Sequence, residues 1–169
     1  IGKYRDNQLK KVSGSSVCRR LDVISTIFTS IKKEWGYDVK NPVLAIRRPK
    51  RSEPRNRRLS DKEINLLLKG NRTSELLRTI IQVALETGMR QGEILRIHPD
   101  HIKGKTLLIP IAKTKPRTIA LTTKALDILK RAAIPFNITQ DHLPKQFQKP
   151  CKHYGIKDAH FPDLRKNTP

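Results

Sequence analysis

Residues 85–95 read LETGMRQGEIL, and this stretch constrains the fold more than any other. An apolar helical run ends at Gly88, Arg90 follows two residues later, and Glu93 precedes the return of the apolar pattern at Ile94. A glycine at a helix end permits a tight turn, because it adopts left-handed backbone angles without steric cost. We expect the preceding helix to fix the base of Arg90 and to leave its guanidinium free for a partner. The alternative is an arginine that pairs with the C-terminus of its own helix.

The net charge indicates the chemistry of the partner. The chain has 169 residues, with 36 Lys and Arg against 15 Asp and Glu, which gives a formal charge of +21. Such an excess is tolerated mainly where a polyanion neutralises it, and nucleic acid is the first candidate. Binding would then weaken with salt: a plot of the logarithm of the binding constant against the logarithm of the salt concentration would have a slope of about −0.9 per phosphate neutralised on B-DNA. Hydrophobic residues form 36% of the chain in periodic segments, which predicts a folded protein.

Membrane insertion and cofactor binding have no support in the sequence. No apolar run approaches the ~20 residues of a spanning helix, and the first residues, IGKYRDNQLKK, contain no signal-peptide core. Cys18 and Cys151 lie far apart without metal-ligand companions, which is typical of reduced thiols in a cytosolic protein. We expect no metal site at these cysteines. The chain begins with Ile rather than Met, so we also expect it to be a piece of a longer protein.

Two unequal parts joined by a basic segment are expected. Residues 12–36 place apolar side chains at spacings of three and four, which predicts a helix with one apolar stripe. We assign 1–40 to the end of a helical domain that begins upstream. Residues 41–58 carry three prolines and seven Lys or Arg against one Glu, which predicts an extended linker along a phosphate backbone rather than a solvated charge run. The candidate DNA contacts in this linker are Arg47, Arg48, Lys50, Arg51, Arg55, Arg57 and Arg58.

The second part, residues 59–169, is predicted to be mainly α with a small antiparallel hairpin, an α+β fold. The helix over 73–87 is apolar on most sides and is expected at the centre of the core. The runs KTLLIPI and RTIALT flank a short polar turn and predict the hairpin. Pro144 and Pro150 are each expected to break the last helix. Apolar periodicity and capping residues, including the Ser60–Glu63 capping box, predict helices over 60–70, 73–87, 92–96, 122–133 and 139–155.

Three segments resemble the boxes of one family. ETGMRQGEIL resembles the first signature of the tyrosine recombinases, the phage-integrase family; IAKTKPRTIALT is similar to the family's hairpin, and FPDLRK to its His-x-x-Arg box. The boxes occur in the family's order, and KEWGYDVKNPVLAIRRPK resembles the junction between its core-binding and catalytic domains. The resemblance covers nearly the whole chain. It implies a recombinase catalytic-domain fold, truncated at its C-terminus and preceded by the end of a SAM-like core-binding domain.

The resemblance also implies a function. Members of this family, from phages and mobile elements, cleave and rejoin double-stranded DNA through a phosphotyrosine, without metal or nucleotide cofactor, and so carry out integration and recombination. Active relatives form tetramers on DNA, and we expect this chain to be monomeric when free. The expected location is the cytoplasm of a prokaryotic cell or a phage-infected host.

By the same resemblance, Arg90 and Arg165 would grip the scissile phosphate. Charge builds on the non-bridging oxygens during cleavage, and planar guanidinium groups offer paired donors to them. Glu93 would support Arg90, the alternative being an ordinary first-turn helix carboxylate.

The hairpin would supply further cations. Lys113, in its turn, would donate a proton to the leaving 5′ oxygen, a task that suits an ammonium on a long, flexible stem. Lys115 is the alternative, because the turn is slightly shorter than the family's common form. Arg117 is expected to contact the DNA backbone.

Two departures from the family's pattern affect activity. Pro162 stands where the family has a histidine, and it can neither accept nor donate a proton. His160, two residues earlier, would point to the same side of an extended segment and is the substitute, provided that it lies within hydrogen-bond reach. The family's nucleophilic tyrosine lies downstream of Arg165, and the tyrosines present do not match its place, so we expect this chain to be inactive in strand cleavage. They are Tyr4, Tyr37 and Tyr154, the last of which is expected to pack locally.

Four functions are compatible with these features. A recombinase fragment is the leading hypothesis, and a non-catalytic DNA-binding protein derived from an integrase is the alternative that Pro162 favours. Type IB topoisomerases share the arginine, lysine and histidine set, but the residues around Arg90 resemble integrases more closely. A basic ribosomal or RNA-binding protein is disfavoured, because an aromatic content of 5% offers little base stacking.

Overall fold

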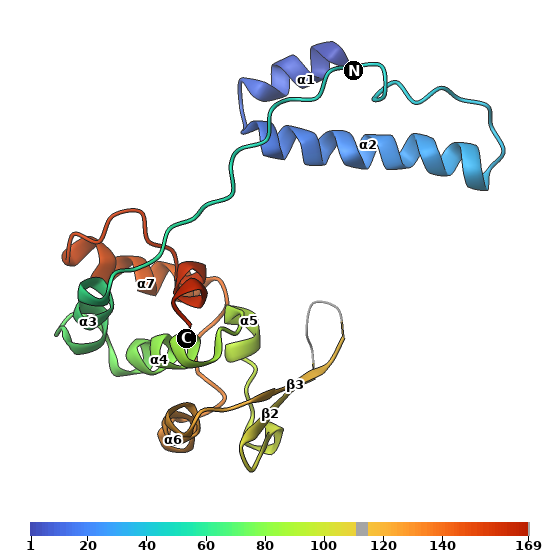
Figure 1. Ribbon diagram of the computed structural model, residues 1–169. Coiled ribbons are helices and arrows are strands. Elements are labelled where there is room, and N and C mark those ends of the chain that lie inside the picture. The colour runs from blue at the N-terminus through green and yellow to red at the C-terminus, as the bar shows by residue number, and fades with distance from the viewer. Residues whose placement is uncertain (111–114, 169) are drawn as a thin grey trace. The chain divides into compact units, whose positions relative to one another are not determined.

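The computed structural model describes residues 1–110 and 115–168. The chain divides into two compact units, Ile1–Arg55 and Asn56–Pro169 (Figure 1). Each unit has its own hydrophobic core, and the larger core belongs to the second unit. The predicted site residues of the three family-like boxes all fall in this second unit.

The first unit contains helices α1 (Gly2–Leu9) and α2 (Gly14–Glu34). Ser13 caps α2, because its side chain accepts a hydrogen bond from the main-chain N–H of Ser16. The structure confirms the helix predicted over this region. Its apolar stripe is only partly covered: Leu21 is fully buried, whereas Ile27 and Trp35 are exposed. Helix α1 was not predicted, since it has no apolar face to produce a periodic signal.

Part of the segment expected to be a linker packs against α2. Val43 is buried beside that helix, and the Asn41 amide donates to the hydroxyl of Ser25 at 2.9 Å. Further along, the main-chain N–H of Ser52 donates to the hydroxyl of Ser15 at 2.8 Å. Residues 41–52 are therefore part of the first unit.

The second unit is mostly helical and carries a small antiparallel sheet, as predicted. Within the described residues the sheet has the strand order β1-β2-β3, and Thr106 pairs with Ala120 and Ile109 with Arg117. Strand β1 adds an edge that the predicted hairpin lacked. The elements are α3 (Asp61–Lys69), α4 (Glu75–Thr87), α5 (Gln91–Ile94), the 3₁₀ helix η1 (Pro99–His101), β1 (Ile102–Lys103), β2 (Thr106–Ile109), β3 (Arg117–Ala120), α6 (Thr123–Arg131), α7 (His142–His153) and the 3₁₀ helix η2 (Phe161–Asn167).

Helix α4 is the centre of this unit, which confirms its predicted place. It packs against α3, α6, α7 and η2 (Figure 1). Fully burying each large aliphatic side chain stabilises the fold by about 1.5–3 kcal/mol. The position of η2 against α4 is what brings the C-terminal box of the sequence to the turn that follows α4. The buried side chains of α4 are Leu77, Ile80, Ile81, Val83 and Ala84.

Two expectations about local structure are wrong. Helix α7 is continuous over His142–His153, so neither proline breaks it. Pro144 lies in the first turn, where a missing N–H costs nothing, and the burial of Leu143, Phe147 and Pro150 stabilises the rest of the helix. FPDLRK is also not extended, because residues 161–166 form most of η2.

Candidate phosphate-binding site

The turn after α4 orients Arg90. Gly88 ends the helix with left-handed backbone angles (φ 60°), and its N–H donates to the carbonyl of Ala84. Met89 is buried and anchors the turn, and Arg90 is the N-cap residue of α5. The side chain of Arg90 is 44% exposed. Its base is therefore fixed and its head reaches the surface, although Nη1 also donates to Glu93; the predicted phosphate contact stays a prediction.

Glu93 is a buried carboxylate between two arginines. Its side chain is 5% exposed and accepts four hydrogen bonds. Two come from Arg90, through its main-chain N–H (2.9 Å) and Nη1 (3.0 Å), and two come from Nη1 (3.0 Å) and Nη2 (2.9 Å) of Arg117. Burial raises the pKa of Glu93, but the hydrogen bonds from Arg117 and Arg90 outweigh it and hold the pKa below its usual value. Glu93 therefore holds two arginine side chains, which an ordinary first-turn helix carboxylate does not do.

Arg165 lies at the same turn as Arg90. Its Nε donates to the carbonyl of Gly88 at 2.6 Å, although 77 positions separate the two residues in the sequence. The side chain of Thr168 also borders this glycine, and a Cβ placed there would come within 3.1 Å of the threonine hydroxyl. The first and last of the predicted boxes thus meet at one helix end.

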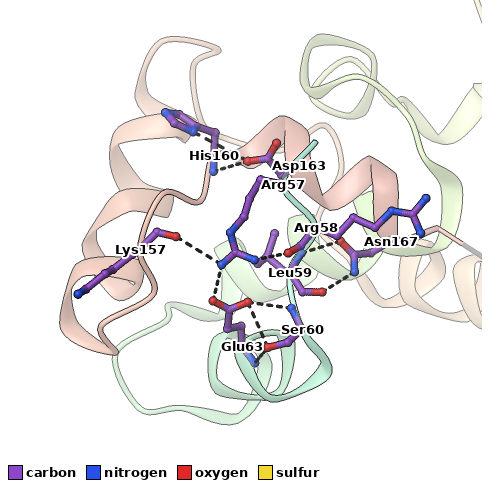
Figure 2. Close-up of polar contacts among 9 residues, drawn as sticks. All are labelled: Arg57, Arg58, Leu59, Ser60, Glu63, Lys157, His160, Asp163 and Asn167. Carbon is purple, nitrogen blue, oxygen red and sulfur yellow. Dashed lines mark hydrogen bonds and ion pairs between the residues drawn. The ribbon is translucent and has the colours of Figure 1, made fainter. Parts of the chain in front are cut away.

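Helix η2, which carries Arg165, is anchored at both ends (Figure 2). At its start, the buried side chain of Asp163 accepts from the main-chain N–H of His160 at 2.9 Å. At its end, the amide of Asn167 donates to the carbonyl of Leu59 at 2.6 Å and accepts from the Leu59 N–H at 3.1 Å. Short 3₁₀ helices have poor internal hydrogen bonds, so such external contacts stabilise them. No local sequence pattern links positions 59 and 167, and the sequence prediction missed this contact.

His160 and Pro162 do not have the relation expected of an extended segment. His160 is the N-cap residue of η2, its ring is 58% exposed, and its Nδ1 lies 3.9 Å from an oxygen of Asp163. Pro162 occupies the first turn of η2, where its missing N–H has no helical partner to lose. Proline at position 162, where the resemblance predicts a histidine, therefore leaves this segment folded.

The two lysines predicted for the hairpin turn remain predictions. Lys113 lies outside the described residues, and Lys115 is exposed just before β3.

Most basic residues of 41–58 are exposed, and some of them also form ion pairs. Arg48 forms a hydrogen-bonded ion pair with Asp22, and Arg51 reaches the same carboxylate at 3.5 Å. Arg57 is half-buried and paired with Glu63, a member of the α3 capping box, and it also contacts the carbonyl of Lys157 (Figure 2). The exposed basic side chains are those of Arg47, Arg48, Lys50, Arg51, Arg55 and Arg58.

Tyr154 packs against the core of its own unit, but its hydroxyl contacts a residue distant in sequence rather than a local one. Its hydroxyl accepts a hydrogen bond from the main-chain N–H of Arg72 at 2.8 Å, and the ring contacts the core. Cys18 and Cys151 are free and buried, and burial raises the pKa of Cys151 to about 11. Among the described residues, no cluster of His, Cys, Asp or Glu could hold a metal ion. No helix in the described part of the chain is long and apolar enough to cross a membrane.

Comparisons with known proteins identify relatives of this chain. The sequence profile of the Phage integrase family matches residues 57–134. The Shufflon-specific DNA recombinase of Escherichia coli is 32% identical over 98% of this chain and 47% of its own length. A putative integrase/recombinase of Haemophilus influenzae is 30% identical over 95% of this chain and 59% of its own length. The chain thus spans about half the length of these relatives.

Solved structures show the same fold at low identity. A lambda integrase dimer bound to a COC′ core site superposes with a TM-score of 0.81 and 19% identity, covering 99% of this chain and 70% of that one. The Tn1549 transposon integrase in complex with circular intermediate DNA has a TM-score of 0.74 and 10% identity, with coverage of 98% and 68%.

Proposed function

The chain belongs to the phage integrase family, the tyrosine recombinases, and from this premise we propose that it is the DNA-binding part of a site-specific recombinase. Arg90 and Arg165 bind one phosphate of the DNA backbone in this proposal. The observation that carries it is the hydrogen bond from Arg165 to the carbonyl of Gly88, two residues before Arg90. Two guanidinium groups from distant boxes are thereby held at one turn.

The chemistry of strand exchange suits such a pair. Attack on a phosphodiester places negative charge on the non-bridging oxygens, and donors already fixed in place stabilise that charge without reorganisation. Arginine is suited to this task because its planar fork matches phosphate oxygens and stays protonated. The anchoring of η2 and of the α4–α5 turn supports a pocket that is formed before DNA binds.

Further roles in the proposal follow the family's boxes. Lys113, or Lys115 in its place, protonates the leaving 5′ oxygen, and His160 is the weaker candidate for proton transfer in the position of Pro162. Tyr154 is committed to a structural hydrogen bond, so it is not the proposed nucleophile. Strand cleavage then requires a tyrosine that this sequence does not supply.

DNA binding itself would draw on a wider surface. The exposed basic residues of 41–58 lie along the phosphate backbone in this proposal, and they add affinity without reading the sequence. We propose that the chain is monomeric without DNA, that the intact recombinase assembles on DNA as a tetramer, and that it acts in the cytoplasm of a prokaryotic or phage-infected cell. A non-catalytic DNA-binding protein is the second candidate, because Pro162 replaces the residue that would transfer a proton.

Salt-dependent binding to a DNA duplex tests the DNA-binding proposal. Fluorescence anisotropy of the 169-residue chain with a labelled duplex gives the binding constant at several salt concentrations. Its logarithm should fall with the logarithm of the salt concentration, with a slope of about −0.9 multiplied by the number of phosphates contacted. Arg90→Ala should weaken binding modestly. Its matched control, Arg131→Ala, removes an exposed arginine that bonds to its own helix α6, and it should bind as the wild type does. Binding that does not respond to salt would overturn the proposal.

A covalent assay separates the two candidates. The full-length product of the gene should form a protein–DNA adduct on a nicked suicide substrate, and Arg90→Ala should abolish that adduct. If no adduct forms under any metal-free condition, the chain belongs to a non-catalytic DNA-binding protein. An adduct preserved in Arg90→Ala would refute the role of this arginine.

A further inference from the structure

The contacts of Arg117 are not those expected of a side chain that binds DNA. Both of its terminal nitrogens are turned to Glu93, in a bidentate pair at 3.0 and 2.9 Å. A guanidinium in this geometry already has an anion matched to its fork. Its side chain is 37% exposed, so it borders the surface while its donors face inward.

The carboxylate that Arg117 holds is fully used. An ionised carboxylate offers about four lone-pair sites, and Glu93 accepts two hydrogen bonds from Arg117 and two from Arg90. Two positive charges thus share one buried negative charge, which leaves one positive charge in surplus. Because Arg117 contributes both of its bonds to Glu93, that surplus falls at Arg90, whose head is the more exposed of the two.

Removing Arg117 would change this balance. Glu93 would remain buried with half of its hydrogen bonds lost, and an uncompensated buried carboxylate is costly. Arg90, the other cation in contact with it, would be drawn toward Glu93. A guanidinium that neutralises Glu93 in this way is no longer available to a phosphate.

The same contact joins two elements. Arg117 is the first residue of β3 and pairs with Ile109 across the sheet, whereas Glu93 belongs to α5. The ion pair therefore ties the base of the β2–β3 hairpin to the short helix that begins at Arg90.

We propose that Arg117 is a positioning residue: it neutralises Glu93 so that the charge of Arg90 remains free for DNA phosphate, and it does not bind DNA itself. This inference rests on the proposed function, and it replaces the DNA-backbone contact expected for Arg117 from the sequence. A lysine cannot replace Arg117 in this role, because a single ammonium does not span both carboxylate oxygens.

The test compares Arg117→Lys, Arg117→Ala and the double variant Glu93→Gln/Arg117→Ala in the 169-residue chain. Arg117→Lys keeps the charge and should still weaken duplex binding, by no more than Arg90→Ala does, because Arg117 acts on DNA only through Arg90. The double variant removes the buried charge together with its partner, so its affinity should recover toward that of the wild type. Arg131→Ala serves as the control for the loss of one positive charge.

A second measurement needs no DNA. The Nε–H signal of Arg90 in an NMR spectrum should shift in both Arg117 variants and return toward its wild-type position in the double variant. If an Arg117→Ala chain fails to fold, Arg117→Lys and the double variant decide the question. Wild-type affinity in Arg117→Lys, or an Arg90 signal that does not respond, would overturn the inference. A wild-type chain that fails to bind the duplex would instead overturn the proposed function. The Arg90 signal would still report whether the Arg117–Glu93 ion pair affects Arg90.

Discussion

The guanidinium of Arg165 donates a 2.6 Å hydrogen bond to the main-chain carbonyl of Gly88. This contact joins the helix η2 to the end of α4, and it places Arg165 beside the turn that presents Arg90. The conformation of Gly88 is therefore important for both arginines. Its carbonyl accepts the hydrogen bond from Arg165, and its turn orients Arg90.

Gly88→Ala should disturb this turn. Gly88 has a φ of 60°, and a side chain in this conformation costs about 1 kcal/mol. The matched control is Gly104→Ala, which has a φ of 58° and open space around it, whereas a Cβ at Gly88 would meet Thr168 at 3.1 Å. Chemical unfolding should show both variants to be destabilised, and only Gly88→Ala should lose DNA affinity. Equal affinity in the two variants would contradict the assigned role of the turn.

Asn167→Ala should loosen the C-terminal end of η2. The substitution leaves both main-chain groups of Leu59 without their partner, which should lower the free energy of unfolding by about 1–3 kcal/mol. Asn167→Asp should cost at least as much, because a carboxylate oxygen would replace the amide nitrogen that donates to the Leu59 carbonyl, and two acceptors would face each other. Urea unfolding measures both values, and two variants as stable as the wild type would show that this contact does not stabilise the fold.

Loss of the Arg117–Glu93 pair should change how stability depends on pH. Because the folded pKa of Glu93 is lowered, the ionised group stabilises the fold above its unfolded pKa of about 4.3, and this contribution is lost as the pH falls through the folded value. In Arg117→Ala the folded pKa should rise. The variant should therefore be about 2 kcal/mol less stable than the wild type at neutral pH, with a smaller difference in acid. Urea unfolding across pH values checks this, and a difference independent of pH would contradict it.

Tyr154→Phe should affect stability and leave DNA binding unchanged. The hydroxyl of Tyr154 accepts from the main-chain N–H of Arg72, and its removal should cost about 0.5–1.5 kcal/mol. Thermal unfolding and duplex anisotropy measure the two effects. A variant that keeps its stability but loses DNA affinity would show that this tyrosine belongs to the binding surface.

Local parts of the site could be predicted from the sequence, and long-range parts could not. The turn at Gly88 and the Ser60–Glu63 capping box depend on residues within one helical turn, so their pattern is visible in the chain. The contact between Leu59 and Asn167 joins positions 108 residues apart, and no spacing rule reports it. These contacts depend on how η2 packs against the helices of its unit.

Helix α7 and Arg117 show two different reasons why a sequence pattern reports only part of the structure: the prediction for α7 is wrong, whereas the DNA contact predicted for Arg117 stays a prediction. The prolines of α7 were expected to break the helix because each removes a main-chain hydrogen bond. The burial of the helix stabilises it by more than that local cost. Arg117 was assigned to DNA because of its charge and its place in the hairpin. The sequence does not show that a buried carboxylate, Glu93, lies opposite it in the fold.

The most direct test of the central claim is a double-mutant cycle on duplex binding with Arg90→Ala, Arg165→Ala and the combined variant. If both arginines bind one phosphate, the losses should not add: the combined variant should bind with a free energy at least about 1 kcal/mol more favourable than the sum predicts. Losses that add within about 0.5 kcal/mol would show that the two arginines act at separate places.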